Sequence, residues 1–199
     1  MGTHKKPTAR GILRMIKSAG SFPQRQRAAR FEHSIAQWFS RVLMVPLFTV
    51  DEIPTVDQYV KWNGSISGWC SSNAGQDITC MCNDFDIVVD CTRSTGNTQW
   101  RMEFGSSVDH YQKHIESKNI NAKETFLLLV CESVSERTYR SIRGAMRSSD
   151  EKFLAVDTEL MAHILRISEL SVTMNRSDFK LLLLTLFHEL HQYCLFPFF

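Results

Sequence analysis

The sequence lacks the long apolar segments that would place it in a membrane. Its 199 residues contain no run of about 18 consecutive apolar residues, so we expect no membrane-spanning helix and no membrane partner. The N-terminus has no apolar core of a secretory signal. Only 9 glycines and 5 prolines occur, while 43% of the residues are hydrophobic. This composition excludes a collagen-like, low-complexity or disordered chain, and the length suits one globular domain.

Cysteine pairs with metal-binding spacing are also missing. The chain has six cysteines but no Cys-x-x-Cys pair, and four of the six lie in apolar, strand-like runs. We therefore expect small buried thiols in a reduced, intracellular protein with a cytoplasmic location, rather than a disulfide framework or a structural zinc site. His188 and His191 are three residues apart, not the four of a zinc-protease helix, which argues against that class as well.

Acidic residues are absent from the first 30 residues, whereas the rest of the chain holds all 21 of them. A basic segment on a mildly acidic body indicates contact with a polyanion such as nucleic acid. We predict a basic N-terminal arm over residues 1–20 and a single domain over 21–199. A solvated tail and an organelle transit peptide are the alternatives for the arm. The cations of this region are Lys5, Lys6, Arg10, Arg14, Lys17, Arg25, Arg27 and Arg30.

Helical spacing of apolar residues predicts a first long helix from about Pro23 to Met44, which Pro46 ends. Glu32 flanks the apolar stripe of this helix. Residues 47–75 are expected to be less regular, with loops at 50–54 and 62–64, short extended pieces between them and a turn-rich segment from Gly68 to Gly75. Residues 94–98 are expected to be loop. The apolar stripe consists of Ala28, Phe31, Ile35, Trp38, Phe39 and Val42.

Strands and helices alternate in the second half of the chain, which predicts a mixed α/β sheet. Buried strands are expected at Phe126–Cys131 and Phe153–Val156. The helices are expected at Val108–Ser117, Thr138–Met146, Thr158–Leu170 and from Ser177 or Asp178 to about Tyr193.

The segment 76–92 alternates apolar and polar residues around an Asn83-Asp84 turn. A two-residue turn predicts a β-hairpin in which Asp77 faces Asp90. Facing residues point to the same side of a sheet, so one side of the hairpin is wholly apolar and is expected to be core. The other side gathers Asp77, Thr79, Met81, Asp86, Val88, Asp90 and Thr92.

Asp77 and Asp90 are candidate metal ligands. Two facing carboxylates about 5 Å apart repel each other and raise each other's pKa unless a cation lies between them. Mg²⁺ accepts a few carboxylates together with water and substrate phosphate, and it activates water for phosphodiester hydrolysis. An aspartate in mid-strand is disfavoured by β-propensity, which favours a functional role for Asp90. The alternative is that Asp77 is a turn residue and Asp90 a solvated acid.

The hairpin and the segments after it occur in a familiar order. They are Gly75-Gln76-Asp77-Ile78, Ile87-Val88-Val89-Asp90-Cys91-Thr92, Gly96-x-x-Gln99, Glu103, Ser107-Val108-x-His110-x-Gln112 and Phe126–Val130. With these segments the sequence resembles the PD-(D/E)xK nuclease superfamily, whose core is an acid, a hairpin and an acid-x-Lys motif. More narrowly, it is similar to the small cleavage subunits and cleavage domains of type IIS restriction endonucleases. The resemblance covers about two-thirds of the chain, from Phe31 to Ile164.

The resemblance implies an α/β protein with a restriction-endonuclease-like mixed central sheet flanked by helices. It implies Mg²⁺-dependent DNA hydrolysis, with Mn²⁺ as a possible substitute. Asp77 and Asp90 would be metal ligands, and Glu32 would be the accessory acid beside the metal. The implied partners are double-stranded DNA and a larger DNA-recognition subunit, because the chain shows no clear recognition motif of its own.

The chain departs from the family motif at Thr92, which occupies the position of the lysine. Some type IIS members carry Ser or Thr there, so activity is not excluded. Gln99 and His110 are the candidates to fill the lysine's role, and Arg93 ranks lower because a regular strand points it to the other face. His110 and His114 are spaced for one helix face, where a metal site is possible and a surface pair is the common interpretation.

The leading hypothesis is a catalytic, strand-cleaving small subunit of a heterodimeric type IIS restriction enzyme. A different PD-(D/E)xK nuclease, viral or RNA-directed, fits the same residues. A catalytically degenerate structural subunit of this fold is the non-enzymatic alternative, and Thr92 is its best support. Activity on DNA against RNA separates the first two, and metal binding that depends on the aspartates separates the third.

Overall fold

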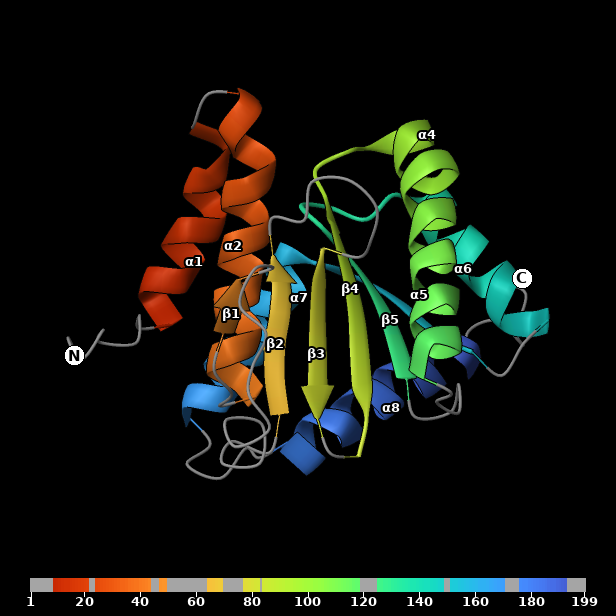
Figure 1. Cartoon of the computed structure of the whole chain (residues 1–199). Coiled ribbons are helices and arrows are strands. Elements are labelled where there is room, and N and C mark those ends of the chain that lie inside the picture. Colours follow the sequence, from red (N-terminus) through yellow and green to blue (C-terminus); the bar gives the residue numbers. More distant parts are fainter. Residues whose placement is uncertain are drawn as a thin grey trace.

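A six-stranded mixed sheet forms the centre of the molecule in the computed structural model (Figure 1). The structure describes residues 9–21, 24–43, 47–49, 64–69, 77–82, 84–118, 125–148, 151–170 and 176–192. The strands lie side by side in chain order: β1 (Leu47–Thr49), β2 (Gly64–Trp69), β3 (Ile78–Cys82), β4 (Asp86–Thr92), β5 (Thr125–Cys131) and β6 (Lys152–Asp157).

At strand β4 the pairing of the sheet changes from antiparallel to parallel. This strand pairs antiparallel with β3 and parallel with β5, while β6 continues the parallel part. On the other side β2 is antiparallel to β3, and β1 is parallel to β2. Every residue of β5 is buried, as expected for a central strand covered on both faces.

Helices cover both faces of the sheet (Figure 1). The first face packs against helices α2 (Gln24–Leu43), α7 (Thr158–Leu170) and α8 (Arg176–Gln192), and α1 (Ala9–Ser18) lies on α2 and α7. The second face packs against α5 (Phe104–Lys118) and α6 (Glu136–Ser148). The short helix α4 (Gly96–Thr98) and the π-helical segment η2 (Gln99–Glu103) lead from β4 into α5.

Each face has its own hydrophobic core. On the first face the aromatic rings of Trp38, Phe39 and Phe179 meet edge to face, and Trp38 Nε1 donates a hydrogen bond to the carbonyl oxygen of Met161 at 2.9 Å. On the second face Tyr111 and Phe153 meet edge to face. Burial of such aromatic side chains fixes α2 and α5 on opposite sides of β4, which determines what reaches the end of that strand.

The hairpin prediction is confirmed to the residue. The pairs Ile78–Val89 and Met81–Asp86 lie in the predicted register, and the Cys82 N–H donates to the Phe85 carbonyl oxygen at 3.0 Å, closing the two-residue turn. The predicted apolar side of the hairpin lies in the first core. The other side is less open than expected, because α5 covers it.

The predicted helices and strands of the second half are also present, with ends that differ by a few residues. The first long helix is α2, although Pro23, Met44 and Pro46 lie outside the described residues. The expectation of a loop at 94–98 is wrong in part, because α4 begins at Gly96. Within 47–75, strands β1 and β2 join the sheet, and Gly68 lies in β2 rather than in a turn.

The described part of the predicted basic arm is an amphipathic helix packed on the body. Ile12 and Ile16 of α1 are buried in the first core, whereas Arg10, Arg14 and Lys17 are exposed. Apolar residues at this spacing form one helical face and therefore dock on α2 and α7. Lys5 and Lys6 lie outside the described residues.

Membrane-spanning helices and cysteines were the subject of two expectations from the composition. Among the described helices, none combines the length and apolar character of a membrane-crossing segment. Cys80, Cys82 and Cys131 are buried free thiols, and Cys91 is a partly buried one. Cys70 and Cys194 lie outside the described residues.

Candidate active site

Asp77 and Asp90 are tied together through the backbone at the open end of the β3–β4 hairpin. The Asp77 N–H donates to Oδ1 of Asp90 at 3.1 Å, and the Cys91 N–H donates to Oδ2 of Asp77 at 2.7 Å. Asp77 lies one residue before β3, and Asp90 lies near the end of β4, where the antiparallel register brings them face to face. The sequence predicted this juxtaposition from the turn and the alternation alone.

Glu32 adds a third carboxylate from α2. The pKa of Asp77 is raised to about 7, first by burial, then by the negative charges of Glu32 and Asp90. The Cys91 N–H and the nearby His110 act in the opposite direction without offsetting the rise. The site therefore gathers more negative charge than its own surroundings neutralise, which is the electrostatic property of a cation site.

Two histidines of α5 bind two aspartates of β4. Nδ1 of His110 lies 2.9 Å from Oδ2 of Asp90, and Nε2 of His114 lies 2.9 Å from Oδ2 of Asp86. The hydrogen bond to Asp90 is the main reason that the pKa of His110 is raised, against a smaller lowering by burial. The histidines therefore contact two separate carboxylates. The His114–Asp86 pair was not predicted, although each of its residues lies four positions from its counterpart in the first pair.

Thr92 lies on the same side of β4 as Asp90 and is buried. Its Oγ1 accepts a hydrogen bond from the Ser94 N–H at 2.9 Å, and Ser94 Oγ donates to Glu103 at 3.0 Å. Thr92 therefore brings no positive charge to this end of β4. The hydroxyl proton is what its side chain has to offer a neighbouring group.

The structure gives Gln99 a different place from the one predicted. Its side chain is fully buried and braces the start of η2 against the loop after β5. The amide nitrogen donates to the carbonyl oxygens of Ser94 and Ser133, and the amide oxygen accepts from the Ser135 N–H and the Thr138 hydroxyl. Both N–H groups and both lone pairs are therefore used, and Gln99 has no group left to act on a substrate.

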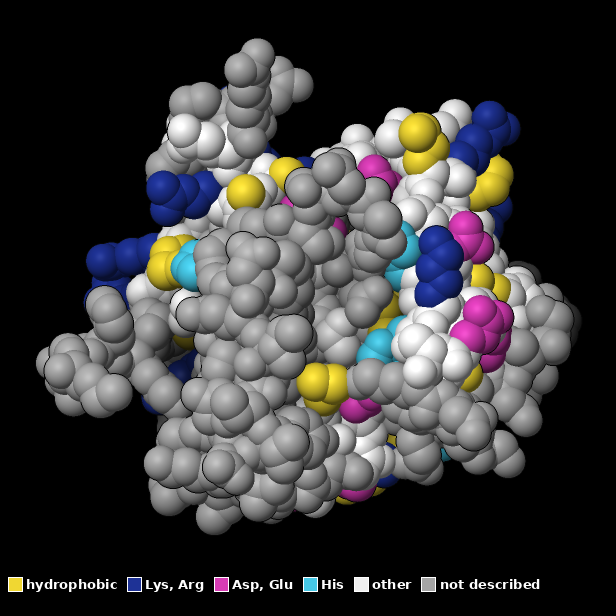
Figure 2. Space-filling view, viewed as in Figure 1, with side chains coloured by type: hydrophobic (Ala, Val, Ile, Leu, Met, Phe, Trp, Pro, Cys, Tyr) yellow, Lys and Arg dark blue, Asp and Glu magenta, His cyan; other side chains and the backbone are white. Residues whose placement is uncertain are grey.

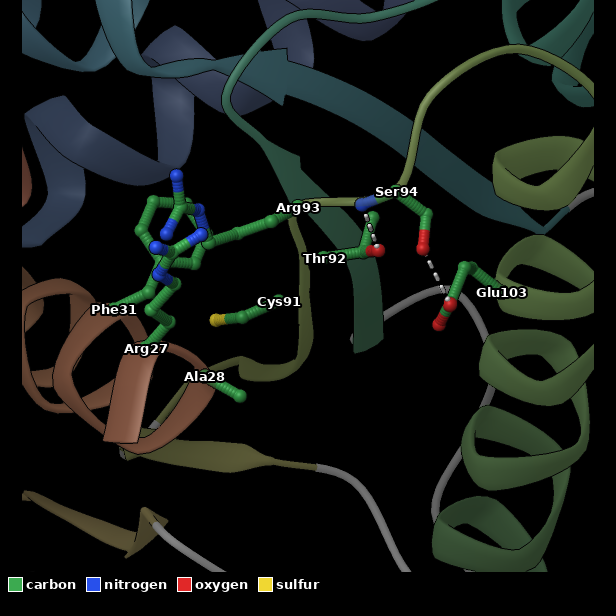
Figure 3. A pocket seen from close by; sticks show the side chains of 8 residues that line it. All are labelled: Arg27, Ala28, Phe31, Cys91, Thr92, Arg93, Ser94 and Glu103. Carbon is green, nitrogen blue, oxygen red and sulfur yellow. Dashed lines mark hydrogen bonds between the residues drawn. The ribbon is translucent and has the colours of Figure 1, made fainter. Parts of the chain in front are cut away.

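A cavity of about 520 Å³ opens beside these residues, between α2 and the end of β4. In the close-up of Figure 3 the side chains of Arg27, Phe31 and Arg93 lie to one side of β4, and Thr92, Ser94 and Glu103 lie to the other. The cavity was not predicted, because only the packing of α2 on the sheet brings Arg27 to Arg93. Ala28 and Cys91 complete its lining.

A complete metal-ligand set is not preformed in the described part of the chain. No three His, Cys, Asp or Glu side chains among the described residues converge as a metal cluster. Mg²⁺ does not need such a cluster, since one or two carboxylates with water and substrate phosphate suffice. The Asp77–Asp90 pair meets this requirement, and the surplus negative charge around Asp77 fits a divalent cation.

The sheet order and the helices on its two faces define the fold of a restriction endonuclease subunit. A solved structure with this fold is the small subunit (R.BspD6I2) of the heterodimeric restriction endonuclease R.BspD6I. The two chains superpose with a TM-score of 0.66 over 93% of this chain and 97% of that chain, at 17% sequence identity. No protein-family model matches the sequence, and no curated protein matches it. The predicted fold class is therefore confirmed.

Proposed function

We propose that this protein is a Mg²⁺-dependent endonuclease that hydrolyses phosphodiester bonds of double-stranded DNA. The observation that carries the proposal is the exchange of hydrogen bonds between Asp77 and the Asp90–Cys91 segment, with Glu32 close enough to raise the pKa of Asp77. Strand-end carboxylates on this fold are suited to hold a metal at a scissile phosphate.

Asp77 and Asp90 would hold Mg²⁺, or Mn²⁺ in its place, with Glu32 as the accessory acid. The bound ion supplies an activated water and offsets charge that develops on the phosphate. Asp77, whose pKa is raised to about 7, gives up its proton readily when a cation arrives. The Cys91 N–H then keeps the Asp77 carboxylate in place through the 2.7 Å hydrogen bond.

His110 fills part of the role that the motif lysine has in the family. Its Nδ1 atom is bound to Asp90, which orients the ring and favours the protonated form. Protonated His110 places a positive charge beside the carboxylates where Thr92 brings none. Its side chain is 17% exposed, so a substrate phosphate or a water can approach the ring.

We also propose that the chain works with a larger subunit that reads the DNA sequence. The similar solved structure is a small subunit of a heterodimeric restriction endonuclease and matches over 97% of its length. A catalytic subunit of this size needs a partner for recognition, because the sequence shows no recognition motif such as a zinc finger.

A nicking assay tests the function. Plasmid DNA, with RNA as the parallel substrate, is incubated with Mg²⁺ and the protein, with and without a larger DNA-recognition subunit. Asp90→Asn keeps a hydrogen-bond acceptor for the Asp77 N–H but removes the charge, and we expect it to lose nicking by at least about a thousandfold. Asp109→Asn, on the exposed face of α5, is the matched control. Equal nicking by Asp90→Asn and the unmodified protein would reject the proposed site.

The degenerate-subunit alternative has one observation in its favour, the uncharged Thr92 at the lysine position. Calorimetric titration with Mn²⁺ separates it from an active enzyme. An active site binds the ion in the unmodified protein and loses that binding in Asp77→Asn. Absence of binding in both would favour the structural subunit.

A further inference from the structure

The cavity between α2 and the end of β4 holds a cationic group that the proposed metal chemistry does not use. We propose that this cavity binds a backbone phosphate of the DNA strand next to the one that is cut, with Arg93 as its main ligand. The inference rests on the proposed function, because it assigns the neighbouring subsite of the same site.

Arg93 is the observation that points to an anion. Its Nη2 atom donates to Oε1 of Glu132 at 2.7 Å, but its Nε and Nη1 atoms are buried and have no hydrogen-bond partner among the described residues. Buried donors without partners are costly, more so on a charged group. A phosphate accepts from two guanidinium N–H groups at once and would supply the missing acceptors after a small movement of the side chain.

The backbone opposite Arg93 leaves room for this guanidinium. A Cβ atom added at Gly20 would lie 2.9 Å from Arg93 Nη2, so the short 3₁₀ helix η1 (Ala19–Ser21) approaches the arginine as closely as a glycine permits. Arg27 of α2 lines the same side of the cavity and adds a second positive charge there (Figure 3). Glu103 lies on the other side, bound by Ser94.

The cavity is adjacent to the three carboxylates. Cys91 lines it, while the N–H of the same residue binds Asp77. Phe31 also lines it, and the next residue of α2 is Glu32. The cavity is therefore close enough to these carboxylates to take the phosphate next to a scissile phosphate held at Asp77 and Asp90.

The wider surface supports a nucleic-acid strand over a small free anion. Lys and Arg side chains lie over the region of α1 and α2 in Figure 2, and α2 is the helix that supplies Arg27 to the cavity. Arg10, Arg14 and Lys17 are the exposed cations of α1, and the described part of the chain before Glu32 carries no acid. Such a surface attracts a polyanion along its length.

The test measures binding without cleavage. A short fluorescein-labelled duplex is titrated with full-length protein in Ca²⁺ at several salt concentrations, and fluorescence anisotropy gives the affinity and its salt slope. We expect Arg93→Gln to weaken binding about tenfold and to lower the slope by about one unit, as for one lost phosphate contact. Arg93→Lys should retain part of the affinity, since it keeps the charge and loses the two-pronged geometry.

A second variant fills the cavity without changing its charge. Ala28 is exposed on α2 and lines the cavity, so Ala28→Leu should fold normally and still weaken duplex binding by severalfold. Arg41→Gln, an exposed arginine at the far end of the same helix, is the matched control and should leave affinity unchanged. Full affinity in both Arg93→Gln and Ala28→Leu would overturn the proposal.

A parallel arm uses inorganic phosphate alone. If phosphate raises the melting temperature through Arg93 while the duplex affinity of Arg93→Gln is normal, the cavity holds a free anion and the proposal fails. The outcomes also separate the two proposals. If Arg93→Gln loses binding and the unmodified protein never nicks DNA, the proposed function is rejected and the subsite is kept. If the unmodified protein nicks DNA and Arg93→Gln binds normally, the subsite alone is rejected.

Discussion

His110 and Asp90 form an ion pair in which Nδ1 of the imidazole lies 2.9 Å from Oδ2 of the carboxylate. The other oxygen of the same carboxylate accepts the Asp77 N–H. Asp90 is therefore held from α5 and from the hairpin at once, so its orientation depends on a residue that is 20 positions away in the chain. Positioning of a metal-binding carboxylate by such a partner commonly determines how well the site works.

Replacement of His110 tests this relationship. His110→Gln keeps a donor near Asp90 but cannot carry the positive charge. We expect nicking to fall about 10- to 100-fold, mainly in kcat, because the carboxylate is less well held and the charge is lost. The pH profile distinguishes a role of the His110 charge from a structural role. Activity of the unmodified protein should decline as pH rises through the raised pKa of His110, and the variant should lack that decline. His188→Gln, exposed on α8, is the control. A lower rate with an unchanged pH profile would leave His110 with a purely structural role.

Asp77→Asn should stabilise the metal-free protein at alkaline pH. The pKa of Asp77 is raised from 3.8 to about 7 in the folded state, so between these values the folded protein holds a proton that the unfolded chain has lost. Stability therefore decreases as pH rises through this window, by up to about 1.4 kcal/mol for each unit of the shift. Asparagine has no proton to lose and still accepts from the Cys91 N–H.

Urea unfolding in EDTA at pH 5 and pH 8 measures this effect. The stability advantage of Asp77→Asn should be larger at the higher pH, and it should disappear when Mn²⁺ is added to the unmodified protein. Asp109→Asn provides the baseline for an exposed acid. The same advantage at both pH values would show that Asp77 is not the titrating group.

The register of the β3–β4 hairpin could be predicted from the sequence alone. A two-residue turn and a side-chain period of two determine which residues face each other, so the meeting of Asp77 with Asp90 needed no knowledge of the rest of the chain. Helices such as α7 were predicted equally well, because their apolar spacing is a local property. Both results depend on residues close in sequence.

The roles of Gln99 and Arg93 depend on distant residues and were not predictable. Gln99 gained its partners from the loop after β5, about 35 residues further along, and nothing local marks a glutamine as buried. Arg93 was ranked low because it leaves β4 on the side away from Thr92. That side is where α2 contributes the other wall of the cavity, which a strand pattern alone does not reveal.

Gln99→Ala should destabilise the fold more than it alters the chemistry directly. The substitution leaves two backbone carbonyls, one backbone N–H and one hydroxyl without their partner in a buried place. We expect a loss of about 3 kcal/mol in the free energy of unfolding, since each orphaned group costs about 1–3 kcal/mol and water recovers part of it. Denaturant unfolding measures it, with exposed Thr98→Ala as the control. Loss of nicking with full stability would return Gln99 to the list of catalytic candidates.

The exposed cations of α1 should contact DNA away from the cut. Replacing Arg10, Arg14 and Lys17 by Gln leaves the buried face of α1 intact, so folding should be normal. Binding should weaken about equally for all sequences, and the salt slope should fall by up to about 0.9 for each lost contact. Arg166→Gln, exposed on α7, serves for comparison. An unchanged slope in the triple variant would show that α1 does not touch phosphate.

The two histidine–aspartate pairs fix the position of α5 along β4. Asp86 and Asp90 are spaced by four strand residues, about 13 Å, whereas His110 and His114 are spaced by four helical residues, about 6 Å. Both pairs nevertheless close at 2.9 Å, so the longer strand interval is bridged by side chains that spread outward from the helix. Because the two intervals differ, both contacts form at this position of α5 along β4, and a slide of α5 by one turn opens both. The buried His114–Asp86 pair therefore holds α5 where His110 can contact Asp90.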